Sequence, residues 1–189
     1  MFYVQNPSDE RILAVLAELA DAPFTHVDVG SSEADLERAP PGYVLDRYGV
    51  ELGRGQAVFE RARAALERVD NYPPSFTRIV RQPGDLAPGQ LFATVARHPG
   101  FVSVHPCRIL YVLREEGRFG FGFGTLPGHA ESGEERFLVT LQNGRVRYDV
   151  QAFSRPHGLI SRLAAPISRF YQLRFQRETV ETMVALARG

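Results

Sequence analysis

The sequence predicts an α+β fold: a curved antiparallel sheet of about six to seven strands wrapped on a long C-terminal helix, with an extra N-terminal helix. Six segments of alternating apolar and polar residues follow one another between Phe76 and Phe153, joined by short turn-forming sequences. An amphipathic helical pattern from Pro166 to about Ala187 then follows. One uninterrupted run of strands between helical ends favours a helix-grip-like architecture, in which a cavity lies between the sheet and the last helix.

Residues 1–42 are predicted to form an N-terminal helical extension. Ser8 can cap a helix that continues to Ala22, because acidic residues follow it and apolar residues then recur at helical spacing. Residues 23–42 are polar and rich in Ser, Asp and Pro, which indicates a surface connection. Residues 43–189 are predicted to form the helix-grip-like domain.

A strand and a helix open that domain. Tyr43–Leu52 can form a strand, and the pattern of Gln56–Val69 predicts a helix with an apolar inner side. Gly53 and Gly55 suit a tight turn between them. A dinucleotide-binding fingerprint is not completed, because Val58 occupies the position of its third glycine.

Six strand predictions come next. In order they read FTRIVR, QLFATVAR, FVSVHPCRILYVLRE, RFGFGFGTL, ERFLVTL and RVRYDVQAF. The QNG between the last two predicts a tight hairpin, because Asn and Gly accept the positive φ that such a turn requires. His105 and Pro106 interrupt the third segment and indicate a bulge or an edge position.

The C-terminal region is predicted to be helical in two parts. Pro156 and Pro166 divide it, so a short helix is expected near residues 157–164 and a longer one over residues 166–187. The apolar face of the longer helix is expected to hold Ile167, Phe170, Tyr171, Leu173, Val180, Met183 and Val184.

The composition excludes several kinds of site. The single cysteine, Cys107, excludes an internal disulfide and a multi-cysteine zinc site, and it is expected to be a packed thiol. The absence of Lys excludes Schiff-base chemistry and a phosphate-binding P-loop. No apolar run is long enough to span a bilayer and no signal-peptide pattern opens the chain, so a cytoplasmic location is expected. No cofactor is expected.

The run FGFGFG, residues 119–124, alternates the bulkiest apolar side chain with no side chain. On a strand, the three Phe therefore line one face and the three Gly leave the other face bare. Burial of each ring contributes about 2 kcal/mol or more. Each Gly weakens the strand, so something must need the space. A packed helix or a sharp bend of the sheet is the favoured explanation, and a bound ligand is the alternative.

The loop that follows, PGHAESGEE, carries His129, Glu131, Ser132, Glu134 and Glu135. These side chains could hold a divalent metal or perform acid–base chemistry, but a solvent-exposed hairpin has the same composition. No metal is therefore expected. The last two carboxyl groups face opposite sides if the strand has begun, so at most one of them can join a common site.

Charge is unevenly distributed although the formal net charge is zero. Residues 1–60 hold eleven acidic residues and four Arg, whereas residues 136–177 hold eight Arg and one acidic residue. The favoured interpretation is that the two regions face each other in the fold. An anionic ligand or a membrane surface is the alternative for the basic region, with the membrane ranked last. Nucleic-acid binding is not expected, because no recognised motif accompanies the balanced charge.

Three segments, GFGFGTLPGHAESGEERF, AFSRPHG and ELGRG before a helix, resemble the uncharacterised family called domain of unknown function nineteen-ninety. The similarity extends from about Tyr43 to the C-terminus and implies no agreed activity. It marks as motif positions Thr125, His129, Glu134, Glu135, Arg136, Ser154 and Arg155. The helix-grip interpretation also makes the chain similar to the START and polyketide-cyclase superfamily (SRPBCC), whose members mostly bind apolar or amphipathic molecules.

Two functions are compatible with this fold. The first is binding of a small hydrophobic or amphipathic molecule in the cavity between the sheet and the C-terminal helix. Its expected ligand-binding residues are Phe119, Phe121, Phe123, Phe137 and Tyr148 as walls and Thr125, His129, Glu134, Arg136, Ser154 and Arg155 as polar groups. The alternative is an enzyme of the hydrolase, cyclase or isomerase type with His129 and Glu134 as acid and base. The sequence indicates no oligomeric state.

Overall fold

The computed structural model of the protein describes residues 1–157 and 165–189. In this part of the chain, eight antiparallel strands form one sheet in the order β2-β8-β7-β6-β5-β4-β3, and β1 pairs with β5. The strands are β1 (Phe2–Tyr3), β2 (Val44–Arg54), β3 (Thr77–Arg81), β4 (Leu91–His98), β5 (Phe101–Glu115), β6 (Arg118–Thr125), β7 (Glu131–Gln142) and β8 (Arg145–Pro156).

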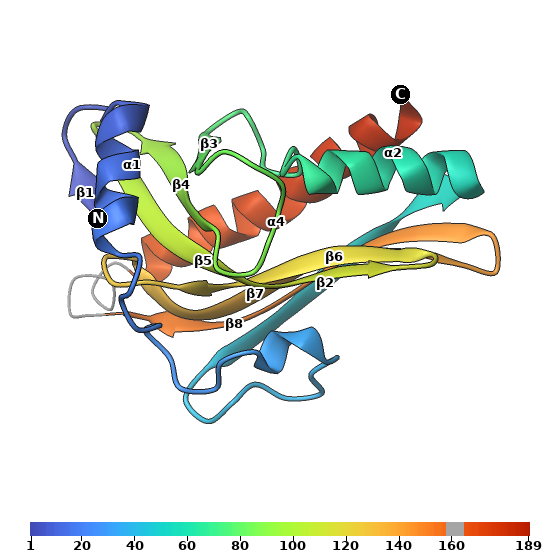
Figure 1. Cartoon of the computed structure of the whole chain (residues 1–189), viewed down its shortest axis with the longest axis horizontal. Helices are drawn as coiled ribbons and strands as arrows, with labels where there is room; N and C mark the ends of the chain where they lie inside the picture. Colours follow the sequence, from blue (N-terminus) through green and yellow to red (C-terminus); the bar gives the residue numbers. More distant parts are fainter. Residues whose placement is uncertain (158–164) are drawn as a thin grey trace.

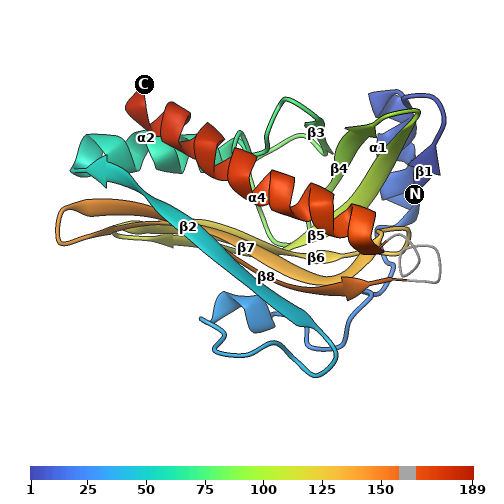
Figure 2. The same cartoon turned by 180° about the vertical axis from the view of Figure 1, so that it is seen from behind.

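The helices lie on both sides of this sheet. They are α1 (Asp9–Glu18), the short 3-10 helix η1 (Ser31–Glu33), α2 (Gln56–Glu67) and α4 (Ala165–Arg188). The sheet curves around α4, which crosses its concave face beside α2 (Figure 1). Viewed from behind, α4 runs diagonally in front of the strands and η1 lies on the other face (Figure 2). The predicted fold class is confirmed.

Local sequence explains several element boundaries. The Ser8 side chain accepts a hydrogen bond from the Arg11 backbone N–H and caps α1, as predicted. Asn143 and Gly144 have φ angles of 50° and 74°, as the predicted hairpin turn requires. The expected short helix near residues 157–164 lies outside the described residues, apart from His157, which follows β8.

His105 and Pro106 occupy an edge position of β5. Both residues pair in regular register with β4. On the other side of β5, the pairing with β1 ends at Ser103 and the pairing with β6 starts at Cys107. A proline without an N–H therefore interrupts no ladder there. The irregularity in β5 lies instead between Ile109 and Tyr111, where the register against β6 shifts.

The concave face and the two longest helices enclose the main hydrophobic core. Phe119, Phe121 and Phe123 are at most 5% exposed in this core, so their row is hidden from solvent as predicted. From α4, Met183 and Ala187 are buried there.

The apolar face of α4 differs from the prediction at two positions. Phe170 and Leu173 are 62% and 50% exposed, whereas Phe175 packs against the core. The side chain of Ile167 lies outside the described residues. The difference arises because α4 crosses the sheet diagonally, so its contact face changes along its length (Figure 2).

The glycine row of β6 faces the outer side of the sheet, where side chains cover it. A Cβ at Gly122 would lie 2.2 Å from the Tyr111 ring, and one at Gly124 would lie 2.7 Å from the Phe24 ring. Among the described residues, no helix packs on these two glycines, although one was expected. Aromatic rings fill the space beside them. The segment of residues 24–36, which supplies Phe24, packs on this face and is more than a surface connection.

Candidate functional site

A cavity of about 280 Å³ lies between the concave face of the sheet and the first half of α4. Small side chains on the strands, including Ala96, Ala152 and Ser154, leave this space under Tyr171 and Phe175 of α4. Phe123 ends the Phe row at its inner wall. Because most of the wall is apolar, the polar groups that reach the cavity define its chemistry.

Glu135 is the carboxyl group that the sheet directs into the cavity. It pairs with Phe123 of β6 and with Ala152 of β8, so all three side chains share the concave face. Burial raises the pKa of Glu135, and the nearby charges of Glu131 and Asp46 raise it further, to about 8. Glu135 is therefore mostly protonated at neutral pH.

Two tyrosine hydroxyls lie at the same cavity. Tyr48 of β2 and Tyr72, which precedes β3, both line it, and both hydroxyl oxygens are buried. Among the described residues neither hydroxyl makes a hydrogen bond of ordinary geometry, although the Tyr48 hydroxyl is near enough to Glu135 to favour its ionised form. Burial and the Glu135 charge raise the pKa of Tyr72 well above its usual value. Both phenols are therefore neutral.

Three imidazoles line the other end of the cavity. Burial lowers the pKa of His129 to about 3, that of His105 well below its usual value and that of His98 less strongly. His129 Nδ1 accepts the backbone N–H of Glu131 at 2.9 Å. The rings of His105 and His129 lie 4.8 Å apart, centroid to centroid. These imidazoles are neutral at physiological pH.

Two further carboxyl groups line the cavity near α4, and each has a polar partner. Asp46 accepts hydrogen bonds from the Arg169 guanidinium at 2.7 and 2.9 Å. Glu131 accepts a hydrogen bond from the Gln172 amide. Burial raises the pKa of Glu131 above its usual value.

Glu134 faces the other side of the sheet. It pairs with Gly124, and its oxygens accept hydrogen bonds from the backbone N–H groups of Gly30 and Ser32 at 2.6 and 2.9 Å. His26 Nε2 lies 2.8 Å from the same carboxylate. Burial would raise the pKa of Glu134, but the hydrogen bonds from His26, Ser32 and Gly30 outweigh it and lower that pKa.

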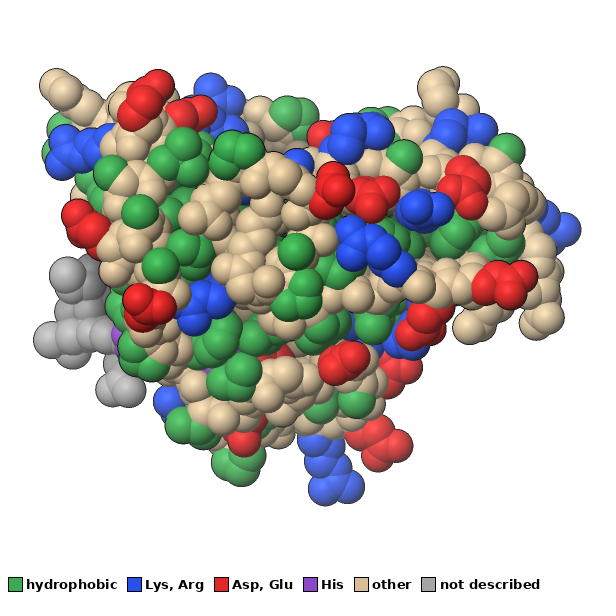
Figure 3. All heavy atoms as spheres, viewed as in Figure 1, with side chains coloured by type: hydrophobic (Ala, Val, Ile, Leu, Met, Phe, Trp, Pro, Cys, Tyr) green, Lys and Arg blue, Asp and Glu red, His purple; other side chains and the backbone are tan. Residues whose placement is uncertain are grey.

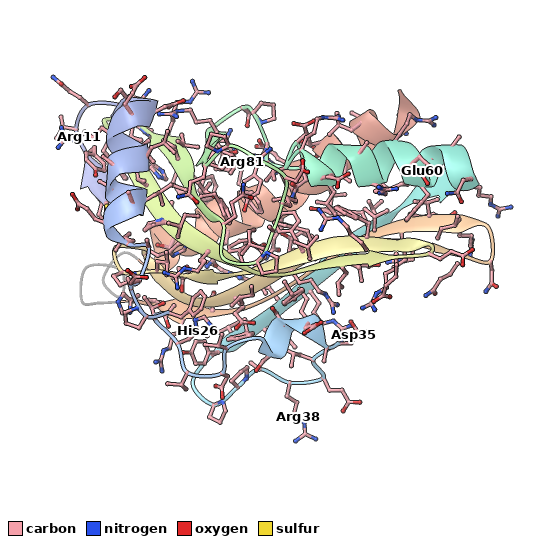
Figure 4. All side chains as sticks on the ribbon, viewed as in Figure 1. Arg11, His26, Asp35, Arg38, Glu60 and Arg81 are labelled. Atoms are coloured by element: carbon pink, nitrogen blue, oxygen red, sulfur yellow. The ribbon has the colours of Figure 1, made fainter. Side chains whose placement is uncertain are left out.

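The expected acid–base pair of His129 and Glu134 is therefore not formed. The Glu134 carboxylate is engaged on the outer face, where Figure 4 shows His26 on the segment that precedes η1. His129 stays on the cavity side. Without contact between the two groups, the geometry does not favour the enzyme alternative built on them.

Arg136 and Arg155 also belong to the outer face. Arg136 is 3% exposed, donates to the Glu33 backbone carbonyl at 2.9 Å and pairs with Asp35, which Figure 4 shows beside η1. The Arg155 guanidinium lies over the Tyr43 ring, 4.5 Å from its centroid. Neither residue lines the cavity, which corrects their expected role as polar ligand-binding groups.

The expected aromatic walls divide between cavity and solid core. Phe119, Phe121, Phe137 and Tyr148 are fully buried away from the cavity, and the Tyr148 hydroxyl lies 3.1 Å from the Thr179 hydroxyl. Of the expected ligand-binding residues, Phe123, Thr125, His129 and Ser154 line the cavity. Glu134 also borders it, but its carboxylate points to the outer face of the sheet.

The sequence did not identify several cavity residues, notably Tyr48, Tyr72 and His105. It also did not show that Glu135, rather than Glu134, carries the carboxyl group that faces the cavity. Alternation along β4 and β5 could have placed some polar side chains on the concave face. No local pattern brings Tyr72, from a connection, to this site. Cys107 also lines the cavity, and its thiol is buried, as expected, which raises its pKa well above the usual value.

The acidic and basic regions of the chain meet in the fold. Among the described residues, three ion pairs join residues 1–60 to residues 136–177: Asp35 with Arg136, Asp46 with Arg169 and Glu51 with Arg145. Figure 3 shows acidic and basic side chains interspersed over one face of the molecule. The favoured interpretation of the charge pattern is thus supported.

The described residues contain neither a helix long and apolar enough to cross a membrane nor a group of three or more His, Cys, Asp or Glu side chains arranged to hold a metal ion.

The chain has relatives along its whole length. The model of a family described as "Domain of unknown function (DUF1990)" matches residues 25–182. A UPF0548 protein from Deinococcus radiodurans is 31% identical over 202 residues, which cover 99% of each chain. A UPF0548 protein from Arabidopsis thaliana is 27% identical over 163 residues, which cover 82% of this chain and 79% of the relative.

Solved structures share the fold at low sequence identity. A hypothetical protein from Helicobacter pylori has a TM-score of 0.58 at 14% identity, covering 88% of this chain and 99% of its own. The Zhui aromatase/cyclase from a Streptomyces species has a TM-score of 0.54 at 17% identity, covering 77% and 94%. A major latex-like protein from Panax ginseng has a TM-score of 0.51 at 13% identity, covering 76% and 96%.

Proposed function

Because the chain belongs to the DUF1990 family, whose description states no activity, we propose a function on the basis of the cavity: the protein binds a small hydrophobic or amphipathic molecule between the sheet and α4. The observation that carries the proposal is the cavity itself, of about 280 Å³. Binding sites for small molecules are typically apolar hollows with a few convergent polar groups.

The composition of the wall supports this function. Phe123, Tyr171 and Phe175 supply apolar surface, while Thr125, His129 and Ser154 supply polar atoms. A cavity without a function would only lower the free energy of unfolding, because the residues around an unfilled volume lose packing contacts. The fold likeness to a protein named as an aromatase/cyclase is consistent with a small molecule in this position.

A cavity-filling variant tests the proposal. Ala96 lines the cavity and is 7% exposed, so Ala96→Phe would fill part of the space that a ligand needs. We expect Nile red, a neutral apolar dye, to fluoresce on binding to the wild type, and its affinity to fall about tenfold or more in the variant.

The matched control is Ala57→Phe, the same substitution at an exposed position of α2. This variant should bind the dye as the wild type does. Ala152→Leu is a milder filling variant if Ala96→Phe unfolds the protein, which thermal unfolding would show. Equal dye binding by the wild type and a folded filling variant would refute binding in this cavity.

A further inference from the structure

Acidic side chains, those of Asp46, Glu131 and Glu135, line the cavity, and among the described residues no guanidinium does. The chain has no Lys. Because the lining imidazoles of His98, His105 and His129 are neutral at physiological pH, the wall provides no cation of its own. An anionic ligand group would therefore meet carboxyl groups and no lining cation among the described residues, besides the cost of burial.

Glu135 is the lining carboxyl group that has no charged or amide partner among the described residues. Asp46 is paired with Arg169, and Glu131 accepts from Gln172. No ion pair joins Glu135 to a described residue, and the Tyr48 hydroxyl is its polar neighbour on the concave wall, where Glu135 lies between Phe123 and Ala152. A carboxyl group that faces an apolar cavity normally has a cation or several donors beside it, so this group is poised for one that arrives with the ligand.

The two unpartnered tyrosine hydroxyls are a second, independent observation. Tyr72 is 7% exposed, lines the cavity and has a buried hydroxyl without a hydrogen-bond partner among the described residues. The Tyr48 hydroxyl is in the same condition. Buried polar groups in folded proteins are almost always satisfied, so two orphan oxygens at one cavity indicate a missing polar partner.

An alkylammonium group satisfies all three positions. It offers three N–H donors and no acceptor, which matches one carboxylate oxygen and two phenol oxygens. Its positive charge also offsets the mutual repulsion among Glu135, Glu131 and Asp46. A hydroxyl or carbonyl group could meet one or two of these oxygens, but it brings no charge to the carboxyl groups.

Resting on the proposed function, we propose that the cavity selects an apolar molecule that carries a basic nitrogen, whose ammonium group pairs with Glu135 and reaches the hydroxyls of Tyr48 and Tyr72. The apolar part of the ligand lies against Phe123, Tyr171 and Phe175.

Binding of an ammonium ion then releases a proton. In the empty cavity Glu135 is mostly protonated at neutral pH, and the bound ammonium requires the carboxylate, so one proton leaves the carboxyl for solvent. The other titratable groups that face Glu135 are Asp46 and Tyr48 from β2, Tyr72, Glu131 from β7, Cys107 from β5 and Tyr148 from β8. Of these, the tyrosines and the thiol stay neutral below pH 9 or so, because burial raises their pKa values.

Three probes with one chain and different head groups test the inference: octylamine, octanol and octanoate, each competing with Nile red. We expect octylamine to displace the dye at the lowest concentration and octanoate at the highest. Octylamine affinity should rise by up to about tenfold per pH unit from about pH 6 to about pH 8, because the amine stays charged there while Glu135 ionises. Octanol affinity should stay level or fall over the same range.

Glu135→Gln isolates the carboxyl. This variant should lose the preference for octylamine over octanol together with its pH dependence, while octanol binding persists and reports an intact cavity. The matched control, Glu60→Gln on the exposed side of α2, should behave as the wild type does. Octanol or octanoate binding more tightly than octylamine in the wild type, or a preference that survives in Glu135→Gln, would overturn the inference and leave the proposed function standing. Failure of all three probes to displace the dye would count against the proposed function itself.

Discussion

Glu134 and Glu135 are consecutive residues of β7, yet their carboxyl groups lie on opposite faces of the sheet in opposite protonation states. Hydrogen bonds from His26, Ser32 and Gly30 overcome the effect of burial and keep Glu134 ionised at neutral pH. Burial and neighbouring acids raise the pKa of Glu135 to about 8. One carboxyl thus fastens the segment of residues 24–36 to the sheet, and the other supplies the polar centre of the cavity.

The two carboxyl groups should respond differently to the same substitution. Glu134→Gln replaces an anionic acceptor of three buried donors with an amide, whose N–H groups face those donors. We expect a loss of about 2–4 kcal/mol in the free energy of unfolding, measured by urea denaturation. Glu135→Gln exchanges one neutral group for another of the same size and should change stability by less than about 1 kcal/mol at neutral pH. Equal losses from both substitutions would contradict this assignment of roles.

Glu135 should also make stability depend on pH. Its pKa is about 8 in the folded state and 4.5 in the unfolded state, so between these values the folded state holds a proton that the unfolded state lacks. The stabilisation is complete below about pH 4.5 and is lost as pH rises through about 8. The free energy of unfolding of the wild type, relative to Glu135→Gln, should therefore fall across this range by at most about 1.4 kcal/mol per pH unit. A flat difference between the two proteins would show that Glu135 is ionised in the fold.

His129 should produce the opposite slope on the acid side. Burial lowers its pKa from 6.5 to about 3, so between these values the unfolded state binds a proton that the folded state does not. This contribution to stability is present above about pH 6.5 and is lost as pH falls toward 3. Relative to His129→Asn, the wild type should lose stability as pH decreases across that range. A difference between the two proteins that does not change with pH would contradict this assignment.

The concave Phe row was predictable because strand alternation is a local property. FGFGFG fixes Phe119, Phe121 and Phe123 on one face without any knowledge of the neighbouring strands. The hairpin at Asn143 and Gly144 was predictable for the same reason, since positive φ angles are a property of the turn alone.

The face of each glutamate was not predictable, because it depends on register between β6 and β7. Phe123 pairs with Glu135 and Gly124 with Glu134, and a shift by one residue would exchange the two carboxyl groups. Residues 126–130 set that register, and their sequence matches no turn with a fixed pairing. The contact of His26 with Glu134 spans 108 positions along the chain, so no local pattern could indicate it.

The bare face of β6 gives the last prediction. Tyr111 occupies the space above Gly122, and its hydroxyl lies 2.9 Å from the Ser32 hydroxyl, so the glycine indirectly holds η1 against the sheet. Gly122→Ala should force the ring aside and cost about 1–3 kcal/mol in the free energy of unfolding. If that cost comes from the ring, it should largely disappear when Tyr111→Ala is already present, because the added methyl group then has room. Urea denaturation of the two single variants and the double variant measures this coupling. Simple additivity of the two losses would mean that Gly122 is needed for another reason, such as the conformation of the strand.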